Sequence, residues 1–349
     1  MNEAESIEHI VVGAGPAGLR AAQVLAQAGK EVLVLEKNEC VGPKTCGGGL
    51  SVKAVHELTA LGLPADAGVN AVAHASFRGE HPAPLDAEHG RIRTLARSRL
   101  GQYQAGWAFA AGAEIRTGAP VSMPDLERRT ITAGGRTLRY RHLIGADGSC
   151  STVRRALGLR SPRVFFAGEF TIAGLRWEHL LVEFDSDALA SGYFWIFPHE
   201  DYTSVGAGAH KGLIPPATIR TFLERRMVEL GIDPGDTPYE GATIEVEPVG
   251  FHFPAGIHLA GDAAGMPSGL TAEGIYAAMI TGEEVARRIL DPRFPKPKTR
   301  AWLRMKRLHD AIGRLWLRRT PRELSLRALH ALCRRPPARR RVSAFFLEG

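Results

Sequence analysis

A glycine-rich turn between a predicted strand and a predicted helix is the feature that most constrains the fold of this chain. The β-branched run at residues 10–12 predicts a buried parallel strand, a helix is predicted over 19–28, and a second buried strand over 32–35 ends at Glu36. Between the first strand and the helix lies a GxGxxG turn formed by Gly13, Ala14, Gly15, Pro16, Ala17 and Gly18. Residues 8–37 are therefore predicted to form one βαβ unit.

Each part of this unit has a physical role in binding a dinucleotide. Gly13 permits the tight turn, Gly15 lets a pyrophosphate approach the backbone, and Gly18 lets the helix pack closely on the strand. The N-terminus of the helix offers free N–H groups and a partial positive charge to the phosphates. Glu36, 18 residues after Gly18, can accept hydrogen bonds from the ribose hydroxyls of an adenosine. The unit predicts a dinucleotide site and leaves open whether the ligand is FAD or NAD.

The length and composition are typical of a globular enzyme with more than one domain. The chain has 349 residues, and no apolar run reaches the length of about 18 residues that a membrane span needs. Its first residues are polar and acidic, without the pattern of a signal peptide. Four scattered cysteines match no zinc spacing, so we expect reduced thiols, no metal site and a cytoplasmic location.

The order of predicted elements indicates a nucleotide-binding domain that an antiparallel sheet interrupts. Residues 164–208 alternate with the period of strands, and Pro82 and Pro84 predict a turn in an earlier strand region. A third buried strand is predicted at 257–260 and a long helix over 272–290. The predicted boundaries are 1–65, 97–160 and 256–290 for the nucleotide-binding domain, 66–96 and 161–255 for the antiparallel-sheet domain, and 291–349 for a basic helical segment.

Several later residues predict contacts with a flavin. A Gly/Asp turn after a strand can place an acceptor on the ribityl hydroxyls, and such turns follow the predicted strands at 143–146 and 257–260. A glycine-rich helix start can stabilise negative charge on the reduced flavin ring. A basic residue also opens the helix predicted over 97–112. The residues concerned are Arg97, Asp147, Gly261, Asp262, Gly269, Gly274 and Ile275.

Together these motifs resemble the flavoproteins related to p-hydroxybenzoate hydroxylase, and among them the geranylgeranyl reductase family. The resemblance covers roughly residues 8–290. Two motifs favour this family over aromatic hydroxylases: the loop Cys46-Gly47-Gly48-Gly49 is similar to its Cys-Gly-Gly loop, and residues 193–198 match its YxWxFP pattern. The resemblance implies an α/β fold, with a Rossmann-like FAD-binding domain, an inserted antiparallel β-sheet substrate domain and a helical C-terminal segment.

The resemblance also implies an activity and a set of cofactor residues. The family reduces carbon–carbon double bonds of geranylgeranyl or polyprenyl chains by hydride transfer from reduced FAD, with NAD(P)H or another reductant as electron donor. The chain shows no second GxGxxG for NADPH, so the donor stays open. Besides the residues already named, the implied FAD contacts include Lys37, Gly47, Gly48 and Val121.

The aromatic strand and the cysteine loop are the predicted substrate side of the site. On a strand, Tyr193, Trp195 and Phe197 point to one face, where they form either a wall for a long isoprenoid chain or a core stripe of the sheet. Flavin halogenases carry a Trp-rich strand at a similar place, but this strand has one Trp. Cys46 is a candidate proton donor, a redox thiol with Cys40, or a small residue packed under the substrate.

The C-terminal segment is strongly basic. Residues 292–349 contain 17 Lys and Arg against three acids, a net charge of +14, whereas the rest of the chain is at −7. The first helix is predicted to combine a basic face with an apolar stripe, and the second to begin with a capping box at Thr320–Glu323. The stripe is predicted at Ala301, Met305, Leu308, Ile312, Leu315 and Trp316.

Two interpretations of this segment stay open. The helices either contact anionic lipid at the inner face of the membrane or cap the body of the protein with a solvated basic face. Nucleic-acid binding is not expected. For the whole protein, two alternatives to a reductase stay open. One is a flavin monooxygenase or halogenase of the same fold, and the other is a non-catalytic, membrane-associated flavin-binding protein. The oligomeric state also stays open.

Overall fold

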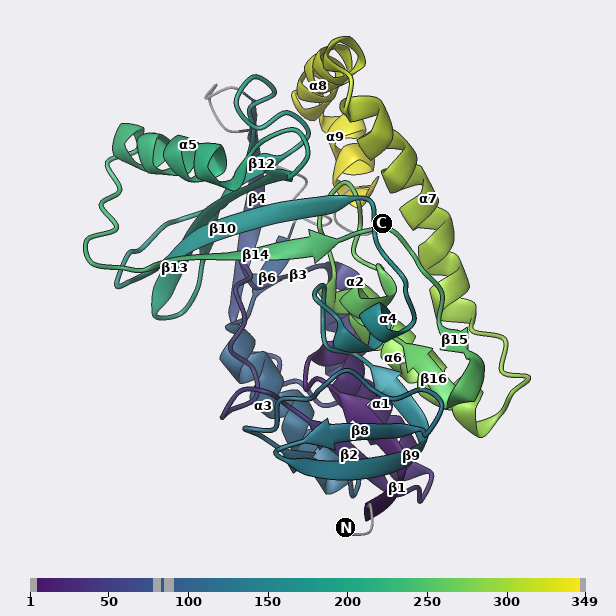
Figure 1. Ribbon diagram of the computed structural model, residues 1–349. Helices are drawn as coiled ribbons and strands as arrows, with labels where there is room; N and C mark the ends of the chain where they lie inside the picture. The colour runs from purple at the N-terminus through teal and green to yellow at the C-terminus, as the bar shows by residue number, and fades with distance from the viewer. Residues whose placement is uncertain (1–4, 78–82, 85–90, 346–349) are drawn as a thin grey trace.

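The computed structural model describes residues 5–77, 83–84 and 91–345. Two sheets lie one above the other, and a long helix, α7 (Pro297–Trp316), runs along one side of both (Figure 1). The predicted α/β fold with an inserted antiparallel sheet and a helical C-terminal segment is confirmed. The turn predicted at Pro82 lies outside the described residues, and Pro84 belongs to a short strand.

The lower sheet in Figure 1 is built around the predicted βαβ unit. Its strand order is β15-β16-β9-β1-β2-β7, with β8 paired to β9, and the central strands β16, β9, β1, β2 and β7 run parallel. The strands are β1 (Glu5–Val12), β2 (Val32–Leu35), β7 (Glu114–Arg116), β8 (Thr130–Ala133), β9 (Arg136–Gly145), β15 (His252–Phe253) and β16 (Ile257–Leu259).

The upper sheet has the order β14-β10-β13-β12-β11-β4-β6-β3, with β5 paired to β4. All its pairings are antiparallel except that between β11 and β4. The strands are β3 (Gly49–Leu50), β4 (Val69–Phe77), β5 (Ala83–Pro84), β6 (Arg91–Thr94), β10 (Val164–Ala173), β11 (Leu180–Phe184), β12 (Tyr193–Pro198), β13 (Tyr202–His210) and β14 (Tyr239–Glu245).

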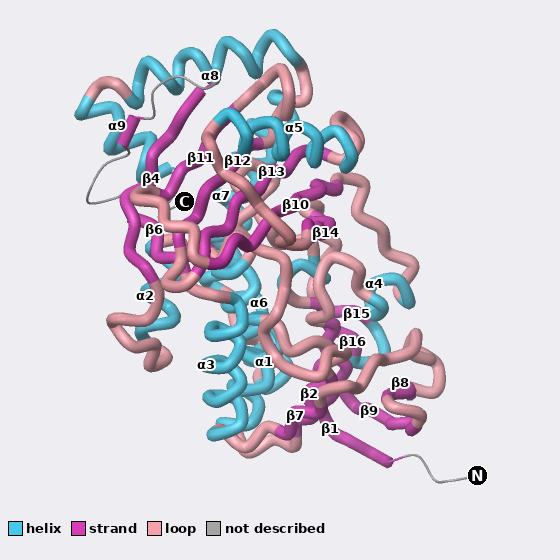
Figure 2. The backbone as a smooth tube through the Cα atoms, turned by 90° about the vertical axis from the view of Figure 1, so that its left-hand side faces the viewer, coloured by secondary structure: helices cyan, strands magenta, loops and turns pink. Residues whose placement is uncertain are grey.

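Helices cover the sheets on different sides. Figure 2 shows α1 beside α3 and α6 against the parallel sheet, and α5 on the outer face of the antiparallel sheet. The helices, besides α7, are α1 (Pro16–Gln27), α2 (Val52–Ala60), α3 (Arg97–Ala110), α4 (Thr152–Ala156), α5 (Pro216–Glu229), α6 (Ile275–Leu290), α8 (Arg319–Cys333) and α9 (Pro336–Ser343), with 3₁₀ turns η1 (Pro254–Gly256) and η2 (Gly261–Ala264).

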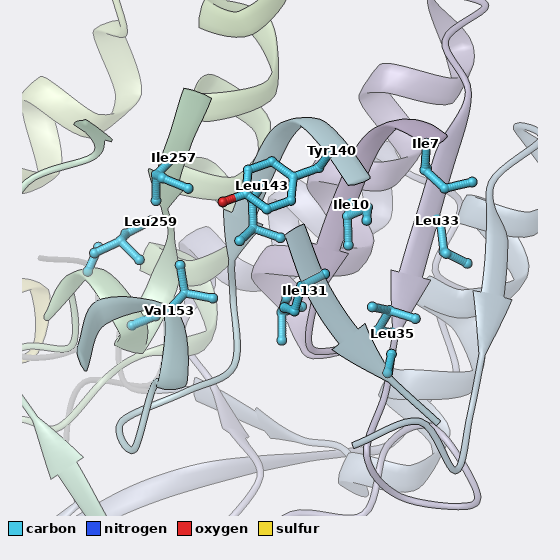
Figure 3. Packing of buried hydrophobic residues seen from close by; sticks show 14 of the residues in the cluster. Ile7, Ile10, Leu33, Leu35, Ile131, Tyr140, Leu143, Val153, Ile257 and Leu259 are labelled. Carbon is cyan, nitrogen blue, oxygen red and sulfur yellow. The ribbon is translucent and has the colours of Figure 1, made fainter. Parts of the chain in front are cut away.

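The core of the lower sheet follows from the two-residue period of its strands. Ile10, Leu33 and Leu143 face the same side and pack together in one buried cluster (Figure 3). Their neighbours Val11 and Val34 point to the opposite side, where they pack beneath the alanine-rich surfaces of α1 and α6. Because both faces are covered, these strands are apolar at every position, as the sequence predicted.

Helix α7 is integral to both halves of the molecule. Trp302 is 2% exposed and belongs to the core of the lower sheet, with its Nε1–H donating to the carbonyl of Met266 at 3.0 Å. Trp316, at the other end of the helix, is 3% exposed and packs in a cluster beneath the upper sheet. At the start of α7, the carboxylate of Glu284 accepts the backbone N–H groups of two of its residues, at 2.8 Å each.

A buried polar cluster bonds the middle of α7 to the body of the protein. The ammonium of Lys306 is 1% exposed and donates to the carbonyls of Val246, at 2.5 Å, and Pro267, at 2.7 Å. Burial lowers the pKa of Lys306 to about 8, although the neighbouring carboxylate of Asp310 opposes that shift. Arg163, which directly precedes β10, also pairs with Asp310, at 3.0 Å. Helix α7 is therefore bonded to the start of β10 and, through Pro267, to the loop that precedes α6.

Several predicted helix boundaries and faces are wrong. Helix α1 begins at Pro16 rather than Leu19, because proline fits the first turn, and α6 begins at Ile275 rather than Ala272, which has a φ of 54°. Helix α8 begins at Arg319, so Thr320 lies inside it and forms no cap. The buried face of α7 is also shifted from the predicted stripe: Leu308 and Leu315 are about half exposed, at 48% and 47%.

Candidate active site

An apolar cavity of about 280 Å³ lies between the two sheets. Pro16 at the start of α1 and Gly274 at the start of α6 border it on one side, and α8 and α9 border it on the other. A second cavity, of about 670 Å³, lies between α7, α8 and α9 and shares Leu329 and Val342 with the first. The apolar side chains of the first cavity include Phe77, Val182, Phe184, Tyr193, Trp195, Phe197, Leu270, Leu329 and Val342.

The glycine loop, Cys46–Gly49, lies flat against the aromatic strand β12. This close approach explains why the loop consists mostly of glycine. A Cβ added at Gly47 would stand 2.9 Å from the Phe197 ring, and one added at Gly49 would stand 2.8 Å from the same ring. Gly48 has a φ of +70° and contacts the imidazole of His199. The Nε2–H of His199 donates to the carbonyl of Gly47 at 2.9 Å, and burial lowers the pKa of this histidine. His199 therefore positions the loop as a neutral ring.

The three predicted substrate residues of β12 are brought together at the cavity. Tyr193, Trp195 and Phe197 all line it, while the intervening Phe194 is fully buried in the cluster beneath α5. The ring centroids of Tyr193 and Trp195 are 6.1 Å apart, and those of Trp195 and Phe197 are 6.4 Å apart. The hydroxyl of Tyr193 donates to the carbonyl of Thr271 at 2.8 Å. The strand thus forms one continuous aromatic wall.

Sequence reasoning missed a buried acid beside this wall, Glu169 of β10. It is 3% exposed, it lines the cavity, and its carboxylate accepts the backbone N–H of Cys46 at 2.6 Å and the hydroxyl of Ser204 at 2.5 Å. Ser204 in turn accepts the Nε1–H of Trp195 at 2.9 Å. Burial raises the pKa of Glu169. Only the alternating pattern around β10 could have pointed to an inward-facing acid.

The structure places Cys46 at the edge of the cavity, and its thiol accepts the N–H of Gly48 at 3.5 Å. Cys40, the suggested redox partner, is exposed, and all four cysteines are free. A chemical role of Cys46 therefore stays a prediction.

The glycine turn has the geometry expected of a phosphate cradle. Gly13 has a φ of +99°, and a Cβ there would stand 2.5 Å from the carbonyl of Ala146. A Cβ at Gly18 would stand 2.0 Å from the carbonyl of Gly13, so this glycine is needed for helix–strand packing. Gly15, in contrast, has open space around its Cα, with no atom within 4 Å of an added Cβ. That opening fits the approach of a pyrophosphate to the helix start.

Two buried polar atoms without a partner also fit a bound dinucleotide. The Nε of Arg97 is buried without a hydrogen-bond partner, and this side chain lines the cavity. The Oδ1 of Asp147 is also buried and unpartnered, while its Oδ2 accepts the N–H of Thr152 at 2.6 Å. An anionic or hydroxyl-bearing ligand would satisfy both atoms. The residues present therefore fit FAD.

The acids predicted to contact the cofactor are held close to the glycine turn and the cavity. Glu36 is 9% exposed and accepts the N–H groups of Ala14, at 2.9 Å, and Asn38, at 3.0 Å. Asp262 lines the cavity and accepts a hydrogen bond from Lys44 at 3.0 Å, which ties the segment just before the glycine loop to the Gly261 turn. Lys44 was not predicted as a site residue.

The remaining predicted cofactor residues lie in several environments. Gly274 and Ile275 line the cavity where α6 begins, whereas Gly269 packs against α7, with an added Cβ 2.4 Å from Asp310. Lys37 is exposed. Val121 is half-buried against the core of the lower sheet, away from the cavity lining. A cofactor role for these residues stays a prediction.

Comparison with known proteins identifies the family. Residues 6–225 match the family model described as an FAD binding domain. The chain is 30% identical over 300 residues to digeranylgeranylglycerophospholipid reductase 1 of Methanopyrus kandleri, covering 78% of this chain and 77% of that protein. The chain belongs to the geranylgeranyl reductase family of FAD-dependent oxidoreductases.

Other members and structures extend this comparison. A menaquinone reductase of Mycobacterium tuberculosis is 30% identical over 335 residues, covering 84% of this chain and 78% of that protein. The crystal structure of a geranylgeranyl bacteriochlorophyll reductase-like protein from Thermoplasma acidophilum has the same fold, with a TM-score of 0.79 at 22% identity over 98% of this chain and 96% of that one. The flavin-dependent brominase Bmp2 shares the fold, with a TM-score of 0.70 at 16% identity over 98% of this chain and 94% of that one. The fold alone therefore does not separate reductases from halogenases.

Proposed function

We propose that this family member saturates carbon–carbon double bonds of a geranylgeranyl or other polyprenyl chain. The observation that carries the proposal is the apolar cavity, which joins the glycine loop and the start of α6 to the aromatic wall of β12. A long, unsaturated and apolar chain suits a cavity with few polar groups. The relatives named after geranylgeranylated lipids and menaquinone support the same class of substrate.

FAD, when bound, supplies a hydride to the alkene, and we propose NAD(P)H or another donor as its reductant. Residues of the chain itself hold the alkene in place and exclude water. The adjacent rings of Tyr193, Trp195 and Phe197 confine the chain on one side, and the flat glycine loop lets it lie close to the cofactor site. Comparing lipid extracts of cells with and without the protein tests the proposal: prenyl chains should gain pairs of hydrogen atoms only when the protein is present.

Trp195→Ala should reduce turnover of a prenyl substrate by at least tenfold while FAD stays bound. The indole ring is 6% exposed, forms the centre of the wall, and its removal also costs about 3–5 kcal/mol of stability. Turnover, flavin absorbance and thermal unfolding should therefore be measured together.

Phe194→Ala is the matched control, because Phe194 lies on the same strand but faces the core beneath α5. It should lower stability similarly and leave the turnover of the folded fraction near normal. Full turnover by folded Trp195→Ala protein would show that these aromatics are only a core stripe.

We further propose that the outer surface of α7 and α8 contacts anionic membranes. Leu308 and Leu315 are exposed beside Arg304, Arg307 and Arg314, an arrangement typical of helices that lie at a lipid surface. Each basic residue near an anionic membrane contributes about 1 kcal/mol. No helix in the described part of the chain is long and apolar enough to span a bilayer.

Cosedimentation should therefore show binding to vesicles rich in anionic lipid, little binding to neutral vesicles, and release as salt rises. The double variant Leu308→Ser/Leu315→Ser should bind several-fold more weakly. Phe109→Ser on α3, which removes an apolar side chain that is 73% exposed, should bind normally. Equal and negligible binding to both kinds of vesicle would end the membrane proposal.

A further inference from the structure

Glu169 of β10 is a buried acid that lines the cavity. In the described part of the chain no ion pair holds this carboxyl group, although it is 3% exposed and surrounded by aromatic and glycine residues. Glu183, on strand β11 of the same sheet, offers a contrast. It is equally buried, at 2% exposed, but its carboxylate accepts two hydrogen bonds from Arg226 at 2.8 Å each.

The hydrogen bonds around Glu169 fix its orientation. One carboxyl oxygen faces the N–H of Cys46, at 2.6 Å, and the other faces the hydroxyl of Ser204, at 2.5 Å. Ser204 is itself held by the indole N–H of Trp195, so the acid is coupled to the substrate wall. Burial favours the neutral acid and raises the pKa of Glu169, and the charge of Glu240 acts in the same direction. The two hydrogen-bond donors and the charge of Arg97 favour the carboxylate and oppose that shift. Glu169 is therefore placed to hold a proton and to remain stable after losing it.

We propose that Glu169 is the proton donor for alkene reduction, an inference that rests on the proposed function. Saturation of a double bond adds a hydride to one carbon and a proton to the other. The O–H bond of Glu169 breaks as the second C–H bond forms, and its electron pair stays on the carboxylate. The N–H of Cys46 and the hydroxyl of Ser204 stabilise that carboxylate, and water restores the proton after the product leaves.

Other groups at the cavity are less well placed for this step. The hydroxyl of Tyr193 is committed to the carbonyl of Thr271, and burial raises its pKa far above neutrality. Glu273 lies at the cofactor side of the cavity, where it accepts a hydrogen bond from Ser51. Cys46 turns its thiol toward the N–H of Gly48.

The first test uses the FAD-loaded protein without substrate. Infrared spectroscopy at neutral pH should show the carbonyl stretch of a protonated, buried carboxylic acid. Burial also raises the pKa of Glu273 and Asp147, so the band is assigned from difference spectra. The difference between wild type and Glu169→Gln should contain it, and the difference between wild type and Glu183→Gln, the matched substitution of an ion-paired acid, should not. A wild-type minus Glu169→Gln spectrum without the band would overturn the inference. This readout does not depend on turnover.

The second test measures turnover of a geranylgeranylated lipid across pH. Glu169→Gln should slow it by about 10²–10⁴-fold, the usual contribution of a general acid, while chemical reduction of its flavin stays normal. Glu169→Asp should recover part of the rate with a shifted pH profile. Normal turnover by Glu169→Gln would refute the inference and leave the proposed function intact. Failure of the wild type to reduce any prenyl substrate would instead refute the proposed function.

Discussion

A chain that ends at Asp291 is expected to lose cooperative folding altogether. The truncation removes α7 to α9, and with them the buried Trp302 and Trp316 that complete the cores of the two sheets. Each tryptophan contributes about 3–5 kcal/mol on burial, so their joint loss approaches the whole stability of about 5–15 kcal/mol typical of a folded protein. The loss of Lys306 also leaves the carbonyls of Val246 and Pro267 without their donor.

A shorter truncation, ending at Arg335, is the control for this prediction. It removes α9 and the residues after it, and with them the contact of Phe345 with His309, but it keeps Trp302, Lys306 and Trp316 of α7. Circular dichroism and thermal unfolding should show a cooperative transition for this protein and none for the chain ending at Asp291. If the chain ending at Asp291 folds cooperatively and binds flavin, then α7 is an accessory helix and the interpretation of its buried face is wrong.

Gly15→Val is expected to remove most of the bound FAD without unfolding the protein. The added side chain meets no protein atom at its Cβ, because that space lies open before the start of α1. It would project where the pyrophosphate must approach, and overpacking of this kind costs about 1–3 kcal/mol or more. The affinity for FAD should therefore fall at least tenfold, which titration by flavin fluorescence measures.

Gly18→Ala distinguishes this effect from general damage to the turn. Its Cβ would stand 2.0 Å from the carbonyl of Gly13, so we expect it to destabilise the βαβ unit itself. In Gly15→Val the altered helix cap should cost about 1 kcal/mol of stability, so the unfolding temperature of the apoprotein should change little. In Gly18→Ala the unfolding temperature should fall strongly. Full flavin content in Gly15→Val would contradict the placement of the phosphate site.

The sequence was most informative where the backbone itself demands particular residues. A positive φ requires Gly13, and the close approach of helix and strand requires Gly18. Requirements of this kind can be recognised from a single sequence. The loop Cys46–Gly49 has a similar requirement, because an added Cβ at Gly47 or Gly49 would stand less than 3 Å from the ring of Phe197. The two-residue period correctly separated Trp195, at the cavity, from Phe194, in the core.

The features that the sequence did not predict depend on distant pairing. Glu169 meets Cys46 only because β10 and the glycine loop, 123 residues apart, come together at the cavity. The buried face of α7 was misassigned because it includes Lys306, His309 and Asp310, whose polar character suggests exposure. Their burial is possible because each has a hydrogen-bond or ion-pair partner in the loops beneath.

The most direct test of the proposed function is an anaerobic single turnover. The flavin of the purified protein is first reduced chemically, a digeranylgeranylglycerol phospholipid is then added, and the lipid is analysed by mass spectrometry alongside the absorbance of the flavin. We expect the flavin to be reoxidised and the lipid to gain two hydrogen atoms for each flavin consumed. An unchanged lipid and a flavin that stays reduced until oxygen is admitted, followed by incorporation of oxygen or halogen into a substrate, would contradict a reductase.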